Sequence, residues 1–175
     1  TIVQWTDGDK TIVRCENENF DKEKGLAMAI VKKLFGTNES KSNYNDIFKK
    51  WLPEKNIDVF FVTLNKADKD YSPTTMYNDY SINESLFHWQ SQSTTAENSS
   101  TGQRYIHHKE RGSRVLLFVR EFKADRMTGG AEAYTYLGTA NYVKHEGSRP
   151  MNITWQLDRP IPAKFLKKTN KLVVG

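Results

Sequence analysis

The chain has 175 residues and a net charge of +5, and 37% of its residues are hydrophobic and 27% charged. We therefore expect one globular domain, or one domain with a small appendage. A membrane span is excluded because no apolar run approaches the roughly 20 residues that it needs. The single cysteine, Cys15, excludes an internal disulfide and any multi-cysteine zinc site. A reducing cytoplasm is the simplest compartment for such a chain.

The first third of the chain predicts a β-hairpin followed by two helices. Two short β-prone runs, Thr1–Trp5 and Thr11–Cys15, flank an Asp-Gly pair that is typical of tight hairpin turns. Between Asp21 and Gly36, apolar residues recur at helical spacing behind a capping residue and before a glycine stop. A second helix is expected from about Ser42 to Leu52. We treat residues 1–52 as an N-terminal segment of unknown role.

Residues 53–175 are expected to form the main domain, which has a β texture. The strand-like runs are Ile57–Leu64, Leu86–Gln92, Arg114–Phe122, Ala133–Leu137, Ala140–Lys144 and Asn152–Leu157. Helical turns are expected at Ser72-Pro73 and Thr101–His108, and a basic helix at Lys164–Lys171. This order of elements predicts an α+β fold, with a small curved sheet or open β-barrel and helices at one side.

No pattern for catalysis, cofactor binding or metal binding is visible. The chain has no phosphate-binding loop, no dinucleotide-binding glycine pattern and no nucleophile elbow. His107 and His108 are adjacent, so their side chains diverge and do not form a spaced ligand pair. Cys15 is read as a small buried hydrophobic residue. We therefore predict a chain that is not an enzyme, with no cofactor and no metal.

The run Leu86–Gln92 has an unusual composition for a strand. Alternation places Phe87 and Trp89 on one face, and His88, Gln90 and Gln92 on the other. Aromatic planes can stack on bases, and carboxamides can pair with base edges. The ordinary alternative is a core face of aromatic residues with a wet reverse face, and periodicity alone favours that alternative.

Just upstream, Tyr77, Asp79 and Tyr80 combine tyrosine rings with a carboxylate. A flipped-base pocket needs π faces around the base and an acceptor for its amino group. Tyrosines near a turn are also common without any ligand. With the Leu86–Gln92 strand, these residues form the candidate base pocket: Tyr77, Asp79, Tyr80, Phe87, His88, Trp89, Gln90 and Gln92.

The C-terminal half is rich in basic residues. Residues 104–126 carry seven Lys or Arg and three Asp or Glu, and residues 144–175 carry seven and two. A basic face suits a polyanion, although a solvated Lys/Arg surface is the ordinary alternative. Phosphate contacts position a protein on nucleic acid. The candidate phosphate-binding residues are Arg104, His107, His108, Lys109, Arg111, Lys144 and Arg149.

Six stretches, in order, make the chain from about Asn56 onward resemble a known bacterial family. They are Asp58–Asn65, Asp70–Tyr77, Leu86–Gln92, Thr101–His108, Gly112–Glu121 and His145–Trp155. The family is a helicase-associated C-terminal domain of proteins that also carry a phospholipase-D-type nuclease and a helicase ATPase. Residues 1–52 weakly resemble small prophage proteins of unknown role instead.

That resemblance implies the target-recognition unit of a modification-dependent, type IV restriction enzyme in a bacterial cytoplasm. Such a unit would bind double-stranded DNA that carries 5-methylcytosine or 5-hydroxymethylcytosine and flip the modified base. Its partners would be nuclease and helicase domains. The implied fold is a PUA-like barrel similar to SET-and-RING-associated (SRA) domains, and a plant-B3-like barrel is the alternative. Other functions stay open: a module that couples a helicase to its neighbours, or a binder of RNA or a modified nucleotide.

Overall fold

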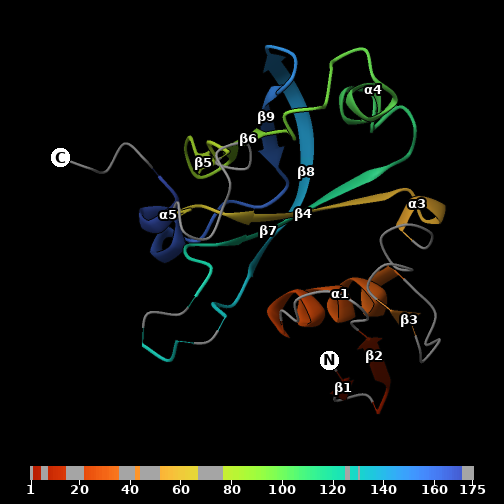
Figure 1. The fold of residues 1–175 in the computed structure, drawn as a ribbon, viewed down its shortest axis with the longest axis vertical. Helices are drawn as coiled ribbons and strands as arrows, with labels where there is room; N and C mark the ends of the chain where they lie inside the picture. The colour runs from red at the N-terminus through yellow and green to blue at the C-terminus, as the bar shows by residue number, and fades with distance from the viewer. Residues whose placement is uncertain are drawn as a thin grey trace.

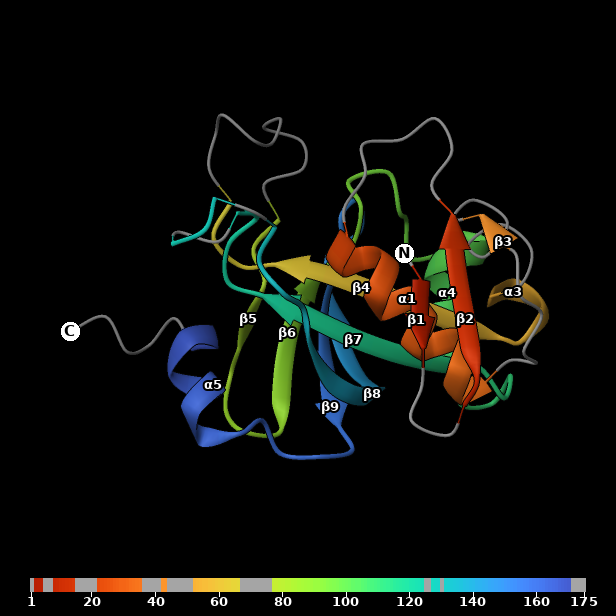
Figure 2. The same ribbon diagram turned by 90° about the horizontal axis from the view of Figure 1, so that it is seen from below.

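This computed structural model describes residues 2–4, 8–14, 22–35, 42–43, 52–66, 77–124, 127–129 and 131–170. The described elements form two sheets, one of three short strands and one of six strands that curls into a half-barrel (Figures 1 and 2). The predicted α+β class with a small curved sheet agrees with this mixed, barrel-like arrangement. Among the described helices, none has both the length and the apolar character needed to cross a bilayer.

The N-terminal strands lie along one side of a long helix (Figure 1). Strands β1 (Ile2–Gln4) and β2 (Lys10–Arg14) form an antiparallel hairpin, and α1 spans Lys22–Phe35, so the predicted hairpin and first helix are confirmed. The expected second helix is wrong at its start, because β3 (Ser42–Asn43) pairs in parallel with β2. The rest of that expected helix, up to residue 51, lies outside the described residues.

The remaining elements build the half-barrel. Its strands are β4 (Ile57–Thr63), β5 (Tyr80–Ser81), β6 (Leu86–Gln90), β7 (Arg114–Arg120), β8 (Thr135–Glu146) and β9 (Asn152–Leu157). Its helices are α3 (Leu52–Glu54), α4 (Ser100–Ile106) and α5 (Ala163–Thr169). The strand order is β4-β7-β8-β9-β6-β5, with β4 parallel to β7 and the other pairs antiparallel. The expected turn at Ser72-Pro73 lies outside the described residues.

Strand β8 corrects one prediction. The sequence predicts two separate strands, Ala133–Leu137 and Ala140–Lys144, on either side of Gly138, but β8 runs through this glycine without a break. The pairing with β7 shifts register here, because Leu117 faces Gly138 and Phe118 faces Tyr136. Gly138 has a φ of +102°, a conformation that costs glycine little, so the glycine accommodates a bulge instead of ending the strand.

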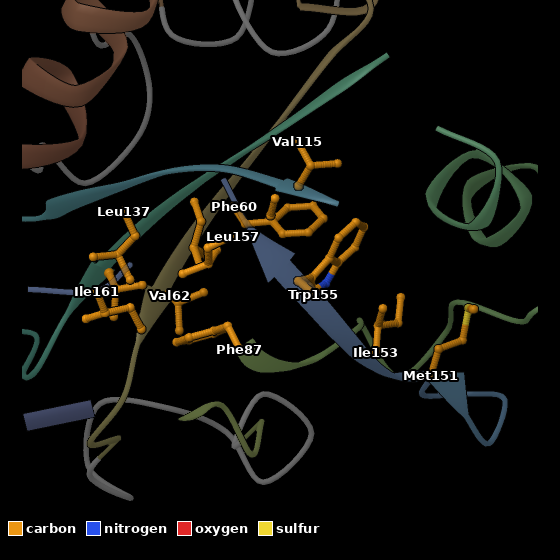
Figure 3. Packing of buried hydrophobic residues seen from close by; sticks show 13 residues of the cluster. Phe60, Val62, Phe87, Val115, Leu137, Met151, Ile153, Trp155, Leu157 and Ile161 are labelled. Carbon is orange, nitrogen blue, oxygen red and sulfur yellow. The ribbon is translucent and has the colours of Figure 1, made fainter. Parts of the chain in front are cut away.

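Two hydrophobic clusters lie on the two faces of β4 and β7. The interior cluster fills the half-barrel, and Figure 3 shows the ring of Phe60 beside that of Trp155, which is fully buried. The outer cluster lies on the opposite face, between the sheet and α1 (Figures 1 and 2). Its buried members are Val13, Met28, Ala29, Val31, Leu52, Ile57, Leu116 and Phe118. Residues from both sides of the predicted boundary near Pro53 therefore share one cluster.

Candidate functional site

The open side of the half-barrel holds a cavity of about 650 Å³ along strand β4. Every residue of β4 lines it, because β4 ends the sheet and, within the described chain, pairs with β7 alone. Other side chains that line it come from β6 and the residues just after it, from α4, from the segment after β4 and from the segment before β5. They are Lys66, Tyr77, Asp79, Trp89, Gln90, Gln92, Arg104 and Tyr105. The cavity therefore gathers residues that lie far apart in the sequence.

Three aromatic rings form one wall of the cavity. Phe60 and Trp89 are stacked with their centroids 4.0 Å apart and their planes 8° from parallel. Tyr105 meets both rings edge-on, at centroid distances of 5.4 Å from Phe60 and 5.5 Å from Trp89. Because these rings already touch, no ligand ring fits between them. A planar ligand in the cavity would instead stack on the side of this wall that faces the cavity.

A buried ion pair closes the cavity just beyond the end of β4. Lys66 Nζ donates to Asp79 Oδ2 at 2.8 Å and to the carbonyl oxygen of Tyr77 at 3.1 Å. The backbone N–H of Gln90 donates to Asp79 Oδ1 at 2.9 Å. The two side chains are only 7% and 3% exposed. Asp79 therefore fastens the chain around Tyr77 to strand β6, with both of its carboxylate oxygens engaged.

A second ion pair lies near the start of β4. Arg104 donates from Nε and Nη2 to the two oxygens of Asp58, and both distances are 2.9 Å. The Arg104 side chain is 41% exposed and that of Asp58 15%. Hydrogen bonding to Asp58 raises the pKa of Arg104. Burial, helped by the charge of Asp58, raises the pKa of the neighbouring Tyr105 to about 12, so its hydroxyl stays protonated at neutral pH.

The cavity brings together many, but not all, of the residues proposed for the base pocket. Those that line it are Tyr77, Asp79, Trp89, Gln90 and Gln92. Phe87 is fully buried in the interior cluster. Tyr80 and His88 stack on each other, with their centroids 4.7 Å apart, and do not line the cavity. The predicted alternation holds for Phe87 and His88, but Trp89 and the two glutamines, which it places on opposite faces, line one cavity.

The two glutamines of the motif differ in their remaining hydrogen-bonding capacity. Gln90 Oε1 accepts from the backbone N–H of Asn78 at 3.1 Å, and its Nε2 donates to Asn152 Oδ1 at 3.1 Å. Gln92 is exposed, and its side-chain amide makes no hydrogen bond to the described part of the chain. Gln92 is therefore the glutamine that can offer both a donor and an acceptor to a ligand.

His108 is the candidate phosphate-binding residue that the structure buries. It is 2% exposed, its Nε2 accepts from the backbone N–H of Tyr142 at 3.0 Å, and its Nδ1 lies 3.2 Å from the carbonyl oxygen of Ser113. Burial lowers the pKa of His108, which favours the neutral ring. His108 therefore ties the turn after α4 to strand β8, with both ring nitrogens engaged.

The other candidate phosphate-binding residues lie on two neighbouring segments. Lys109 and Arg111 are exposed on the turn that follows α4, and Lys144 and Arg149 are exposed on β8 and its connection to β9. His107 lies there too, with Nδ1 2.9 Å from Glu110 Oε2. Helix α4 packs beside β8 (Figure 1). These cations therefore share one end of the half-barrel, next to the end of the cavity that holds Arg104.

Sequence reasoning missed Asp58, Phe60, Lys66 and Tyr105 as cavity residues. One signal was available, because a charged residue such as Asp58 inside an apolar strand is uncommon without a partner. Its partner, Arg104, is 46 residues away and could not be read from the pattern. Within the described residues, no group of three His, Cys, Asp or Glu side chains could hold a metal ion.

One family matches most of the chain. Residues 31–168 match a family described as a domain of unknown function, DUF3427. The chain belongs to this family. The match begins inside α1, so it includes part of the segment predicted to be separate, and it ends inside α5. No curated protein matches the chain.

Proposed function

We propose that this chain is the DNA-recognition module of a modification-dependent restriction nuclease. It binds double-stranded DNA, and the cavity along β4 accepts a flipped cytosine that carries a 5-methyl or 5-hydroxymethyl group. The observation that carries the proposal is the lining of the cavity. An aromatic wall of Phe60, Trp89 and Tyr105 lies beside hydrogen-bonding groups that include Gln92 and Arg104. We further propose that the half-barrel is PUA-like and related to SRA domains.

The energetics of base flipping agree with such a wall. Taking a base out of the duplex costs a few kcal/mol, and stacking on an aromatic surface returns roughly 1–3 kcal/mol per base. The exposed cations Lys109, Arg111 and Arg149 would contact backbone phosphates beside the cavity, whereas Lys144 pairs with Glu146 and would contribute less. The module itself would perform no chemistry, and cleavage would come from nuclease and helicase domains in the same protein or complex.

The test is a fluorescence-anisotropy titration of the chain with duplexes that differ at one cytosine: unmodified, 5-methylated and 5-hydroxymethylated. Single-stranded DNA and a double-stranded RNA of the same sequence serve as competitors. Gln92→Ala should lower the preference for modified duplex, whereas the matched variant Gln156→Ala, on the exposed side of β9, should not. Equal affinity of the unaltered chain for all three duplexes would contradict the proposal, and tighter binding of RNA would favour an RNA-binding function.

A second candidate function rests on the edge of β4 that pairs with no described strand. The N–H of Leu64 donates to the carbonyl of Arg120, and the N–H of Arg114 donates to the carbonyl of Asn56, so even-numbered residues of β4 face β7. The backbone groups of Ile57, Val59 and Thr63 then face away from β7, toward the cavity. An extended segment of a partner protein could pair with this edge. This function is favoured if the chain binds neither DNA nor RNA.

A further inference from the structure

We propose that Arg104, held in place by Asp58, selects cytosine over thymine in the cavity. The inference rests on the proposed function, because it concerns the base that enters the same cavity. The sequence suggested Arg104 only as one of several phosphate contacts. The structure places it in the lining of the cavity, in a planar ion pair with a residue of β4.

The ion pair orients the guanidinium and leaves part of it available. Asp58 takes the Nε–H and one Nη2–H, which leaves the second Nη2–H and the two Nη1–H groups of the planar fork unused by this carboxylate. The carboxylate is the better buried partner, with 15% exposure against 41% for Arg104. The guanidinium carbon also lies 5.5 Å from the centroid of the Tyr105 ring. Asp58 is therefore a positioning residue, and the exposed fork of Arg104 is the group that meets a ligand.

The chemistry of this fork distinguishes the two pyrimidines. Cytosine presents two adjacent acceptors, O2 and N3, on the ring edge away from its 5-position. Thymine has the same O2 but carries a hydrogen on N3, which faces a donor. Arginine only donates hydrogen bonds, and its fork matches a pair of adjacent acceptors. Arg104 would thus bind cytosine twice and be repelled at N3 of thymine, while the 5-methyl group remains free to contact the aromatic wall.

The charge balance of the ion pair also favours contact between Arg104 and the base over contact with a phosphate. Arg104 and Asp58 together carry no net charge, so the pair attracts a phosphate less strongly than an unpaired cation and releases fewer counterions. Arg111, exposed on the turn after α4, has no ion pair with the described residues and is the better phosphate contact. These two arginines therefore make a matched comparison on one stretch of chain.

The test compares two duplexes that differ in one base opposite guanine, 5-methylcytosine or thymine. Both bases carry the 5-methyl group, and the mismatched thymine is easier to unpair, so a preference for 5-methylcytosine must come from the ring edge. We expect the unaltered chain to prefer 5-methylcytosine at least tenfold. Arg104→Gln and Arg104→Lys should reduce that preference to about twofold or less, and Asp58→Asn should reduce it partly. Arg111→Gln should weaken the binding of both duplexes equally and leave the ratio of their affinities unchanged.

Thermal melting confirms that each variant is folded before its binding is read. The inference is overturned if Arg104→Gln keeps the wild-type ratio. It is also overturned if this variant binds both duplexes more weakly by the same factor and the slope of log affinity against log salt falls by about 0.9. That result would identify Arg104 as a phosphate contact. Both of these outcomes leave the proposed function standing. An unaltered chain that binds neither duplex overturns the proposed function together with the inference.

Discussion

Two ion pairs line the same cavity, one near each end of β4, and they differ chiefly in burial. Lys66 and Asp79 are almost completely buried, and every oxygen of the carboxylate accepts a hydrogen bond from the protein. Arg104 and Asp58 are partly exposed, and the guanidinium keeps donors that Asp58 does not use. A pair of a basic side chain with an aspartate therefore supports the fold at one end, whereas at the other end such a pair keeps donors available to a ligand.

This comparison changes which residues are expected to read a base. Asp79, suggested by the sequence as the acceptor for a cytosine amino group, already accepts from Lys66 and from the backbone of Gln90. Gln92 and Arg104 retain hydrogen-bonding capacity toward the cavity. Substitutions at or near the two ends of β4 test this distinction.

Asp79→Asn should lower the free energy of unfolding by about 3–5 kcal/mol. The change leaves the ammonium group of Lys66 buried without a counter-charge, which is the costly way to break a buried pair. Urea unfolding followed by circular dichroism measures the loss. The double variant Lys66→Gln/Asp79→Asn removes both charges and should recover most of it. A loss below 1 kcal/mol in the single variant would show that water reaches this pair.

Acid should destabilise the protein through His108, beside the Arg104 end. Burial lowers its folded-state pKa below the usual 6.5, so the unfolded chain binds a proton first as pH falls. The stabilisation is present above about pH 6.5 and is lost as pH falls toward the folded-state pKa. The loss is at most about 1.4 kcal/mol per pH unit. Protonation of Nε2 also breaks its hydrogen bond from the backbone of Tyr142.

Urea unfolding at pH 7.5 and 5.5 tests this in the unaltered chain and in His108→Gln. The other histidines are present in both proteins, so the difference between the two pH dependences belongs to His108. We expect the unaltered chain to lose more stability on acidification than the variant does. Equal losses in the two proteins would mean that folding does not lower the pKa of His108.

Asp58→Asn is the matched partner of Asp79→Asn and should have a much smaller effect on stability. Arg104 is 41% exposed, so water can solvate its guanidinium when the carboxylate becomes neutral. We expect a loss below about 1 kcal/mol, as for other partly exposed pairs. Urea unfolding of both variants under one condition makes the comparison direct. Equal losses at the two sites would remove the distinction between a supporting end and a ligand-binding end.

The elements of the fold were predictable wherever local pattern decides them. The hairpin before α1, helix α1 itself and strands β4, β6, β7 and β9 follow from alternation, helical spacing and turn residues. The pattern failed where tertiary pairing decides. Ser42 joins β2 as a strand instead of beginning a helix, and Gly138 lies in a bulge instead of a turn. Strand β5, of two residues, has no pattern of its own and was missed.

The candidate site was predictable where its residues lie on or just after β6, or on the segment just before β5. Trp89 and Gln92 were found because they belong to a single unusual motif. Asp58 and Arg104 meet only because β4 and α4 fold against each other, and no spacing in the sequence reports that contact. His108 was suggested for phosphate by its basic neighbours, but its burial depends on the packing of α4 beside β8.

Lys109→Gln should have the smallest effect, and it tests whether the exposed cations near the Arg104 end contact phosphates. Lys109 lies on the turn after α4 and is exposed. A lost phosphate contact lowers the slope of log affinity against log salt by about 0.9, because fewer condensed counterions are released from the DNA on binding. Affinity should fall equally for methylated and unmodified duplex, because a phosphate contact carries no base information. Titrations at several salt concentrations measure both quantities.

Lys164→Gln is the matched control for Lys109→Gln. Lys164 is exposed on α5, at the other side of the half-barrel from α4 (Figure 1), and its substitution should leave the slope unchanged. If Lys109→Gln changes the preference between the duplexes and leaves the slope unchanged, Lys109 acts near the base. The assignment of the exposed cations to phosphates and of Arg104 to the base would then be wrong.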